Sequence, residues 1–292
     1  MLQRLKRWAW DKAIGILLTD TNGKILSPTN FSRLEFEIRP ADVLLVEGRL
    51  RVSHAIKVIT QSSWSHSALY VGRLYDIHDL VAKARIMQHY DGPPDEPLLI
   101  ESQLGKGTVV TPLKFYKDFH TRICRPRGIS PEDVNKVITH ATTFLGMAYD
   151  VRQLLDLARF LIPWWTFMPR RWHSSLFEHN AQAPTKVVCS SMIASAFASV
   201  RFPVLPLIFQ DENKKFTLRE RNLRLFTPRD FDYSPYFEII KYPLLGKDDL
   251  GFYRKLPWDE SGIVTEEAQK YLDAHDVLHI SEGSVSENKF AH

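Results

Sequence analysis

Three side chains that together could carry out acyl-transfer chemistry lie at the ends of predicted secondary-structure elements. Cys189 opens a predicted helix in "VVCSSMIASAF", and free backbone N–H groups at a helix start lower the pKa of a thiol. His66 begins a predicted strand over residues 66–72, and Glu101 ends the predicted strand "LLIES". An imidazole can exchange a proton with the thiol, and a carboxylate can hold the second ring nitrogen. These residues therefore predict a cysteine-dependent hydrolase or acyltransferase site.

Each of these residues also has an ordinary structural explanation. A buried cysteine commonly serves as a small hydrophobic residue, a strand histidine can be purely structural, and Glu101 could be solvated. Cys124 illustrates the contrast, because it lies in the middle of a predicted strand with no helix behind it, and we expect it to be inert. Trp64 could shape or shield the wall of the thiol site or pack in the core. Only the combination favours Cys189 as the nucleophile.

The elements that must position these side chains are predicted strands followed by predicted helices, an order that indicates an α+β fold. The predicted strands cover residues 43–46, 66–72 and 98–101 and the runs "GTVVTPL" and "TRICRP". Helices are predicted after Ser53 as N-cap, from Pro131 with Ser130 as N-cap to Gly146, and from Cys189. We expect an antiparallel sheet that carries His66 and Glu101, with the Cys189 helix packed across its end.

Composition excludes several classes of function. The 292 residues are 44% hydrophobic and 25% charged, which suits a globular core, and the net charge of +4 is too weak to indicate nucleic-acid binding. The two cysteines form no CxxC pair, so we expect a reducing compartment, no disulfide framework, no metal and no cofactor. A metal site built from His54, His66 and His78 lacks credible ligand spacing.

Two segments raise the question of membrane contact. Residues 1–18 read as a short basic amphipathic helix, which either docks on the domain or lies on a membrane surface. The block "IPWWTFMPRRW" has the composition of an interfacial segment or of a loop that covers the core. Its aromatic and basic residues are Trp164, Trp165, Phe167, Met168, Arg170, Arg171 and Trp172. With no signal peptide and no apolar window for a span, we expect a cytoplasmic protein with peripheral contact at the inner membrane.

The segments "ADVLLVEG", "TQSSWSHSALYVG", "LLIES", "FLGMAYD" and "VVCSSMIASAF" occur in an order that resembles one protein family. This family is the permuted papain-like branch of the NlpC superfamily, the YiiX/YebB-type group, whose relatives include the lecithin retinol acyltransferase family. The resemblance covers about residues 38–205, and "LFTPRDFDYSPYFEIIKYP" is similar to the downstream segment of bacterial "lipo-like" members. We therefore divide the chain into an N-terminal amphipathic helix and linker (1–37), a permuted papain-like domain (38–257) and a polar extension (258–292).

The resemblance implies a circularly permuted papain-like fold, in which the histidine strand precedes the cysteine helix. It implies that Cys189 is the nucleophile, His66 the general base and acid, and Glu101 the third polar member. Tyr149 matches a family tyrosine that follows the glycine-ended helix, and it is expected to help bind the developing oxyanion together with the backbone N–H of Cys189. Ser190, the next residue, is expected to belong to the same oxyanion or substrate-binding wall.

The expected reaction is attack of the thiolate on an acyl carbon of an amide or ester, which gives a thioester on Cys189. Water would complete a hydrolysis and another nucleophile an acyl transfer, and the sequence leaves both open. The expected substrate is a lipid or an acylated small molecule. Two alternatives remain, a peptidoglycan-type peptide amidase and a catalytically inactive module that binds lipid or protein.

Overall fold

The computed structural model describes residues 27–149, 186–210, 214–245 and 256. The expected N-terminal helix, the block over residues 162–172 and the extension from residue 258 lie outside the described residues. The chain divides into two compact units, residues 1–20 with 26–245 and residues 21–25 with 246–292. The described helices and strands all belong to the first unit.

A six-stranded antiparallel sheet organises the domain, with the strand order β10-β5-β1-β2-β3-β4. Its strands are β1 (Val43–Glu47), β2 (His66–Gly72), β3 (Leu98–Gln103), β4 (Gly107–Pro112), β5 (His120–Pro126) and β10 (Phe237–Ile240). All five neighbouring pairs are antiparallel. The α+β class and the antiparallel sheet are therefore confirmed. The edge strand β10 was not among the strands that we predicted.

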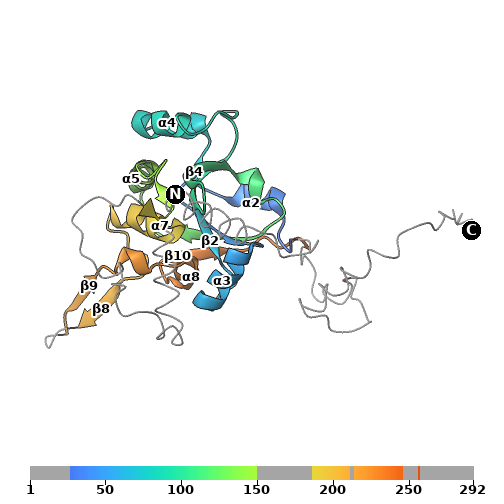
Figure 1. Ribbon diagram of the computed structural model, residues 1–292. Coiled ribbons are helices and arrows are strands. Elements are labelled where there is room, and N and C mark those ends of the chain that lie inside the picture. The colour runs from blue at the N-terminus through green and yellow to red at the C-terminus, as the bar shows by residue number, and fades with distance from the viewer. Residues whose placement is uncertain (1–26, 150–185, 211–213, 246–255, 257–292) are drawn as a thin grey trace, which may run out of the picture. The chain divides into compact units, whose positions relative to one another are not determined.

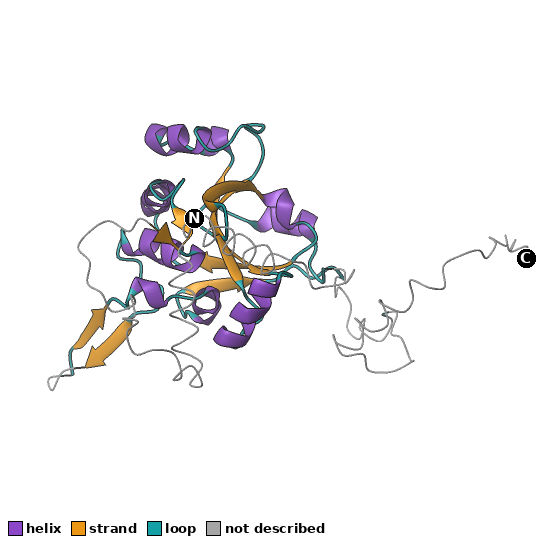
Figure 2. Ribbon diagram, in the orientation of Figure 1, coloured by secondary structure: helices purple, strands orange, loops and turns teal. Residues whose placement is uncertain are grey.

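Helices pack on both faces of this sheet (Figure 1; Figure 2). The described helices are α2 (Phe31–Glu37), α3 (Arg51–Thr60), α4 (Leu80–Met87), α5 (Pro131–Thr142), α7 (Cys189–Ala198) and α8 (Pro228–Tyr233). One core joins the sheet to α4, α5, α7 and α8, and a second joins its other face to α2 and the 3₁₀ turn η2 (Leu113–Tyr116). Although α2 lies in the segment assigned to a linker, its Leu34 is 1% exposed in the second core. None of the described helices has the length and apolar character needed to cross a bilayer.

Strand β1 lies in the interior of the sheet, and its sequence follows from that position. Val43 and Leu45 belong to the core under α7, whereas Leu44 and Val46 belong to the core under α2. Successive strand residues point to opposite faces, so a strand covered on both faces needs a continuous apolar run and not an alternating one. The run "VLLV" meets this requirement.

Helix starts and ends agree with the sequence prediction at Ser130 and at Cys189 and differ from it at two other positions. Ser130 caps α5 as predicted, with its Oγ accepting from the N–H of Asp133 at 3.1 Å. The prediction that Gly146 ends this helix is wrong, because α5 stops at Thr142 and turns follow until Gly146, where φ is +80°. The prediction that Ser53 caps α3 is also wrong, because α3 begins at Arg51. Ser53 is instead buried in the first turn, where it lines a cavity.

A short parallel pair brings a distant part of the chain beside the start of α7. Strands β6 (Ala148–Tyr149) and β7 (Lys186–Val187) align Tyr149 with Val187, two residues before Cys189. The pair is held against β4 by the N–H of Thr108, which donates to the carbonyl of Met147 at 2.8 Å. Gly107 permits this approach, because its φ is +81° and a Cβ there would collide with the same carbonyl.

Strands β8 (Leu207–Gln210) and β9 (Phe216–Arg219) form a separate antiparallel hairpin that projects away from the sheet (Figure 1). All eight strand residues are exposed. The 3₁₀ turn η5 (Leu223–Leu225) follows, and it packs against α7. The hairpin therefore contributes only its base to the rest of the domain.

Candidate active site

Cys189 is the first residue of α7, as the sequence predicted. The preceding Val188 is extended, and its N–H donates to the hydroxyl oxygen of Ser191 at 3.2 Å, while that hydroxyl donates to the Val188 carbonyl at 3.0 Å. These two bonds fix the start of the helix. The backbone N–H groups of the first turn have no hydrogen-bond acceptor within the helix, because no helical carbonyl lies four residues before them. They therefore point out of the N-terminal end of the helix. Cys189 itself is 3% exposed.

His66 is the first residue of β2, and its Nε2 contacts Oε2 of Glu101 on β3. The Glu101 side chain is fully buried, whereas that of His66 is 19% exposed. Two further donors satisfy the buried carboxylate, because the Tyr116 hydroxyl donates to Oε2 and the Gln103 amide donates to Oε1 at 2.8 Å. Neither donor was predicted from the sequence. The spacing of Gln103, two residues after Glu101 on one strand face, was the available signal.

Opposing effects set the charges of the three groups. Burial would raise the pKa of Glu101, but the charge of His66 and its hydrogen bonds outweigh burial and hold that pKa below its ordinary value. Burial would lower the pKa of His66, but the charge of Cys189 and side-chain hydrogen bonds to Cys189 and Glu101 raise it above the ordinary value. Burial would raise the pKa of Cys189, but the charge of His66 and hydrogen bonds from His66 and Ser67 lower it. The site therefore favours a thiolate, an imidazolium and a carboxylate.

The contact with Glu101 also fixes the role of each ring nitrogen of His66. An ionised carboxylate only accepts hydrogen bonds, so Nε2 must carry a proton in both the neutral and the charged imidazole. Nδ1 is therefore the nitrogen left to exchange a proton with Cys189. This is the arrangement that a general base and acid beside a thiol requires.

The second cysteine has a different environment. Cys124 lies within β5 at 0% exposure, and burial together with the charge of Asp232 raises the pKa of its thiol far above the ordinary value. No helix begins at Cys124, which is an interior residue of its strand. Its surroundings are those expected of an unreactive thiol.

Trp64 and Ser190 are both buried, and Ser190 also lines a small slot at Cys189. Trp64 is 4% exposed in the core, its indole N–H donates to Oδ2 of Asp232 at 3.2 Å, and the guanidinium of Arg122 lies 4.8 Å from its ring centre. Ser190 is 1% exposed, and its hydroxyl donates to the carbonyl of Phe226 at 2.6 Å. Core packing, one of the two explanations offered for Trp64, therefore accounts for its contacts. The Ser190 hydroxyl ties α7 to the chain before α8.

Two hollows meet at the candidate site. A slot of about 20 Å³ adjoins Cys189, and a cavity of about 490 Å³ adjoins His66. Ile56, Ser65 and Tyr149 line both. The larger cavity is mainly apolar, with walls that include Val46, Leu50, Ile56, Leu104, Phe115 and Phe119. Tyr149 thus stands at the common wall, where its sequence position led us to expect a substrate-binding residue.

Within the described ranges, no group of three His, Cys, Asp or Glu side chains is arranged to hold a metal ion. His66, the central member of the alternative histidine cluster, contacts Glu101. His54 lies on α3 with its side chain exposed.

No protein-family model matches the chain, and no curated protein matches it. Among solved structures, the chain is similar to the crystal structure of the metalloprotein YiiX from Escherichia coli O157:H7, a DUF1105 protein. The two chains are 17% identical, the alignment covers 70% of this chain and 97% of that one, and the TM-score is 0.43. A similarity this weak does not identify a functional site. The chemistry expected at Cys189 is therefore inferred from the residues that surround it.

Proposed function

We propose that this protein is a cysteine-dependent hydrolase or acyltransferase with Cys189 as nucleophile, His66 as general base and acid, and Glu101 as the residue that orients the imidazole. The observation that carries this proposal is the position of His66, which interacts with the thiol at the start of α7 and with a fully buried carboxylate on β3. The same proposal assigns the domain to the permuted papain-like branch of the NlpC superfamily.

The reaction begins when the Cys189 thiolate attacks the acyl carbon and a carbon–sulfur bond forms. The developing oxyanion accepts hydrogen bonds from the backbone N–H of Cys189 and from the hydroxyl of Tyr149. The His66 imidazolium gives its Nδ1 proton to the leaving nitrogen or oxygen as that bond to the acyl carbon breaks, which leaves a thioester on Cys189. A water or alcohol then loses a proton to His66 and attacks the acyl carbon of the thioester. The carbon–sulfur bond breaks, the acid or ester leaves, and the thiolate and imidazolium are restored.

The substrate that we propose is a lipid or an acylated small molecule. The cavity beside His66 supports this choice, because its walls are mainly apolar and Lys106 adds a positive charge. Its volume of about 490 Å³ lies within the usual range for small-molecule sites, roughly 300–1,000 Å³. A peptidoglycan-type peptide is the competing substrate, and the polar lining residues, such as Ser102 and Gln103, are the groups that it would use. Peripheral contact with the inner membrane remains a proposal, since residues 162–172 lie outside the described part of the chain.

Trapping of the acyl-enzyme tests the proposal. The protein is mixed with p-nitrophenyl decanoate, p-nitrophenyl acetate or an acylated dipeptide, and intact-protein mass spectrometry follows the added acyl mass. We expect a decanoyl adduct that Cys189→Ala removes and Cys124→Ala retains. An adduct that maps to Cys124 contradicts the nucleophile assignment. Absence of any adduct, together with an unshifted Cys189 thiol, supports the inactive binding module instead.

A further inference from the structure

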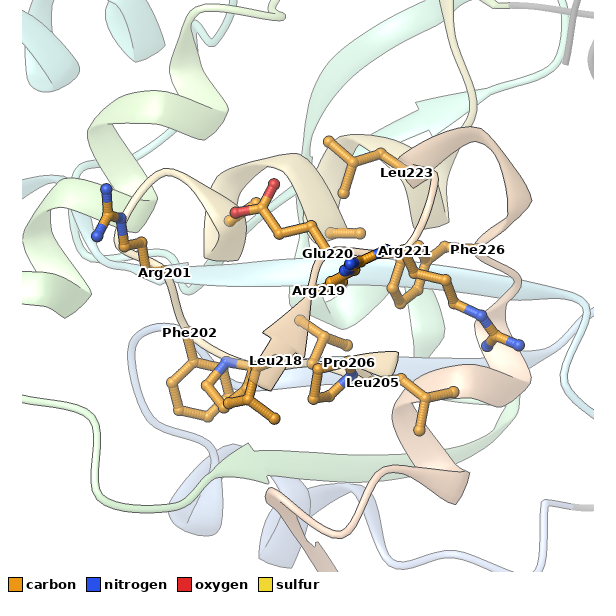
Figure 3. A pocket seen from close by; sticks show the side chains of 14 residues that line it. Arg201, Phe202, Leu205, Pro206, Leu218, Arg219, Glu220, Arg221, Leu223 and Phe226 are labelled. Atoms are coloured by element: carbon orange, nitrogen blue, oxygen red, sulfur yellow. The ribbon is translucent and has the colours of Figure 1, made fainter. Parts of the chain in front are cut away.

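A second cavity, of about 420 Å³, lies at the C-terminal end of α7, away from Cys189. It is enclosed by the end of α7, the segment that follows it, the end of β9 and η5 (Figure 3). Its lining includes Ala194, Ala198, Arg201, Phe202, Leu218 and Phe226. None of these residues lines the cavity beside His66, so the two hollows are distinct.

The lining of this cavity combines apolar and charged side chains. Phe202, Pro206 and Leu218 are among the apolar side chains that form its walls (Figure 3). The charged lining residues are three arginines, Arg201, Arg219 and Arg221, and one carboxylate, Glu220, which gives a formal charge of +2 (three minus one). A site with an apolar interior and an excess of guanidinium groups suits a molecule with an apolar body and a single negative head.

The three arginines are not equally available. The Arg219 guanidinium lies 4.8 Å from the ring centre of Phe209, and Arg221 is 3.6 Å from a carboxylate oxygen of Asp230. Arg201 is exposed in the turn that follows α7, three residues after its last residue Ala198, with φ of 58°, and it forms no ion pair within the described part of the chain. Arg201 is therefore the cation that can best accept a new partner.

We propose that this cavity binds an amphipathic carboxylate, with the apolar body against Phe202, Pro206 and Leu218 and the carboxylate at Arg201. A guanidinium presents paired N–H donors that match the two oxygens of a carboxylate. Glu220 opposes this anion, because its own carboxylate shares the cavity lining. Removal of the charge at Arg201 and at Glu220 must then have opposite effects on affinity.

The cavity adjoins the candidate active site through α7 and Phe226. Phe226 lines both this cavity and the slot at Cys189, and its carbonyl accepts from Ser190 at 2.6 Å. Ser190, Ala194 and Ala198 are spaced four residues apart, so they share one face of α7. A carboxylate ligand in this cavity would therefore contact α7 and Phe226, which both form walls of the slot at Cys189. An effect of this ligand on Cys189 depends on the proposed reactivity of that thiol, whereas binding of the ligand to the cavity does not.

Titration calorimetry with sodium decanoate tests the site in the full chain, with decan-1-ol as the uncharged probe. We expect decanoate to bind more tightly than decan-1-ol, and Arg201→Gln to weaken decanoate binding roughly tenfold, the effect of losing one charge-assisted hydrogen bond. Glu220→Gln should tighten binding, Ala198→Phe should block it, and Arg224→Gln on η5 is the matched control that should leave it unchanged. Binding that survives Arg201→Gln and Ala198→Phe but disappears when Ile56→Trp fills the other cavity overturns the proposal.

A second measurement separates this site from the proposed function. Cys189→Ser should still bind decanoate, whether or not the protein is an enzyme. The rate of Cys189 alkylation by iodoacetamide should change when decanoate is added to the native protein and should not change in Ala198→Phe. An equal rate with and without saturating decanoate overturns the connection between the two hollows. Circular dichroism and the thermal midpoint confirm that Ala198→Phe remains folded, and the exposed Arg201→Gln variant provides the same test without filling the cavity.

Discussion

His66 meets Glu101 through Nε2, and this leaves Nδ1 as the nitrogen that can face Cys189. Because Glu101 is fully buried and held by Tyr116 and Gln103 as well, the carboxylate cannot move without losing several hydrogen bonds. The orientation of the imidazole is therefore set by the sheet and not by the helix that carries the thiol. Substitutions on β3 and η2 should consequently change the chemistry of a cysteine that they do not contact.

Replacement of His66 by Gln should slow alkylation of Cys189. In the native protein the thiolate is present above the lowered pKa of Cys189, and the alkylation rate should fall as the pH falls through that value. In His66→Gln, burial still disfavours the thiolate while the opposing charge is lost, so the pKa should rise above the ordinary value of about 8.5. Each unit of increase lowers the rate at pH 7 about tenfold. Iodoacetamide alkylation against pH, in a Cys124→Ala background, measures the midpoint.

The Cys124→Ala background is needed because alkylation of the native protein would report on both thiols at once. With burial holding the pKa of Cys124 far above the ordinary value, the Cys189→Ala protein should be alkylated only when it unfolds. If instead the two single-cysteine proteins react with similar midpoints, the nucleophile assignment fails.

Replacement of Glu101 by Gln should change how stability depends on pH. The folded state lowers the pKa of Glu101, so its contribution to the free energy of unfolding is complete above the ordinary pKa of about 4.3 and is lost as the pH falls through the folded value. At pH 6 the variant should be less stable by about 1–3 kcal/mol, since the charged hydrogen bond to His66 is lost. This difference should shrink between about pH 4.3 and lower pH. Urea unfolding of both proteins at a series of pH values measures it, and a constant difference would contradict an ionised Glu101.

Replacement of Tyr116 by Phe removes one donor from the buried carboxylate of Glu101. We expect a loss of about 1.5–3 kcal/mol in the free energy of unfolding, the usual range for a hydrogen bond to a charged group. The pKa of Glu101 should rise, which weakens its support of the imidazolium and moves the alkylation midpoint of Cys189 upward. A purely structural role for Tyr116 would lower stability and leave that midpoint in place. Tyr75→Phe, on an exposed tyrosine, is the matched control.

Replacement of Ile56 by Trp should separate substrate size from thiol chemistry. Ile56 lines both the slot and the large cavity, so a tryptophan there should fill space needed by a long acyl group. Formation of the decanoyl adduct should fall at least about tenfold, which corresponds to roughly 1.4 kcal/mol, while alkylation by the small reagent iodoacetamide should keep its midpoint. Val58→Trp, on the same helix at a side chain that is 64% exposed, is the control. Equal losses with p-nitrophenyl acetate and the decanoate ester would show that the cavity does not hold the acyl chain.

Local sequence signals predicted much of this arrangement. The start of α7 at Cys189, the cap at Ser130 and the strand at His66 depend on residues adjacent in the chain, and each agrees with the structure. The start of α3 was missed because Ser53 carries an N-cap signal but is buried against a cavity, so tertiary packing overrides its local preference. Such burial cannot be read from a serine alone.

The residues that were not predicted from the sequence were missed for a common reason. Tyr116 lies 15 residues after Glu101 in a short 3₁₀ turn, and such turns have no sequence period that would place a side chain under the sheet. Arg201 and Glu220 come together only because the hairpin β8–β9 returns the chain to the end of α7. Contacts of this kind depend on the packing of distant elements, which a single sequence does not specify.

The pairing of β6 with β7 joins the common wall of the two hollows to the start of α7. Tyr149 ends β6, and it is aligned with Val187, two residues before Cys189. A shift of this short pair would therefore move Tyr149 and the thiol together. The position of the proposed oxyanion donor relative to the nucleophile thus depends on the backbone pairing of four residues, Ala148, Tyr149, Lys186 and Val187.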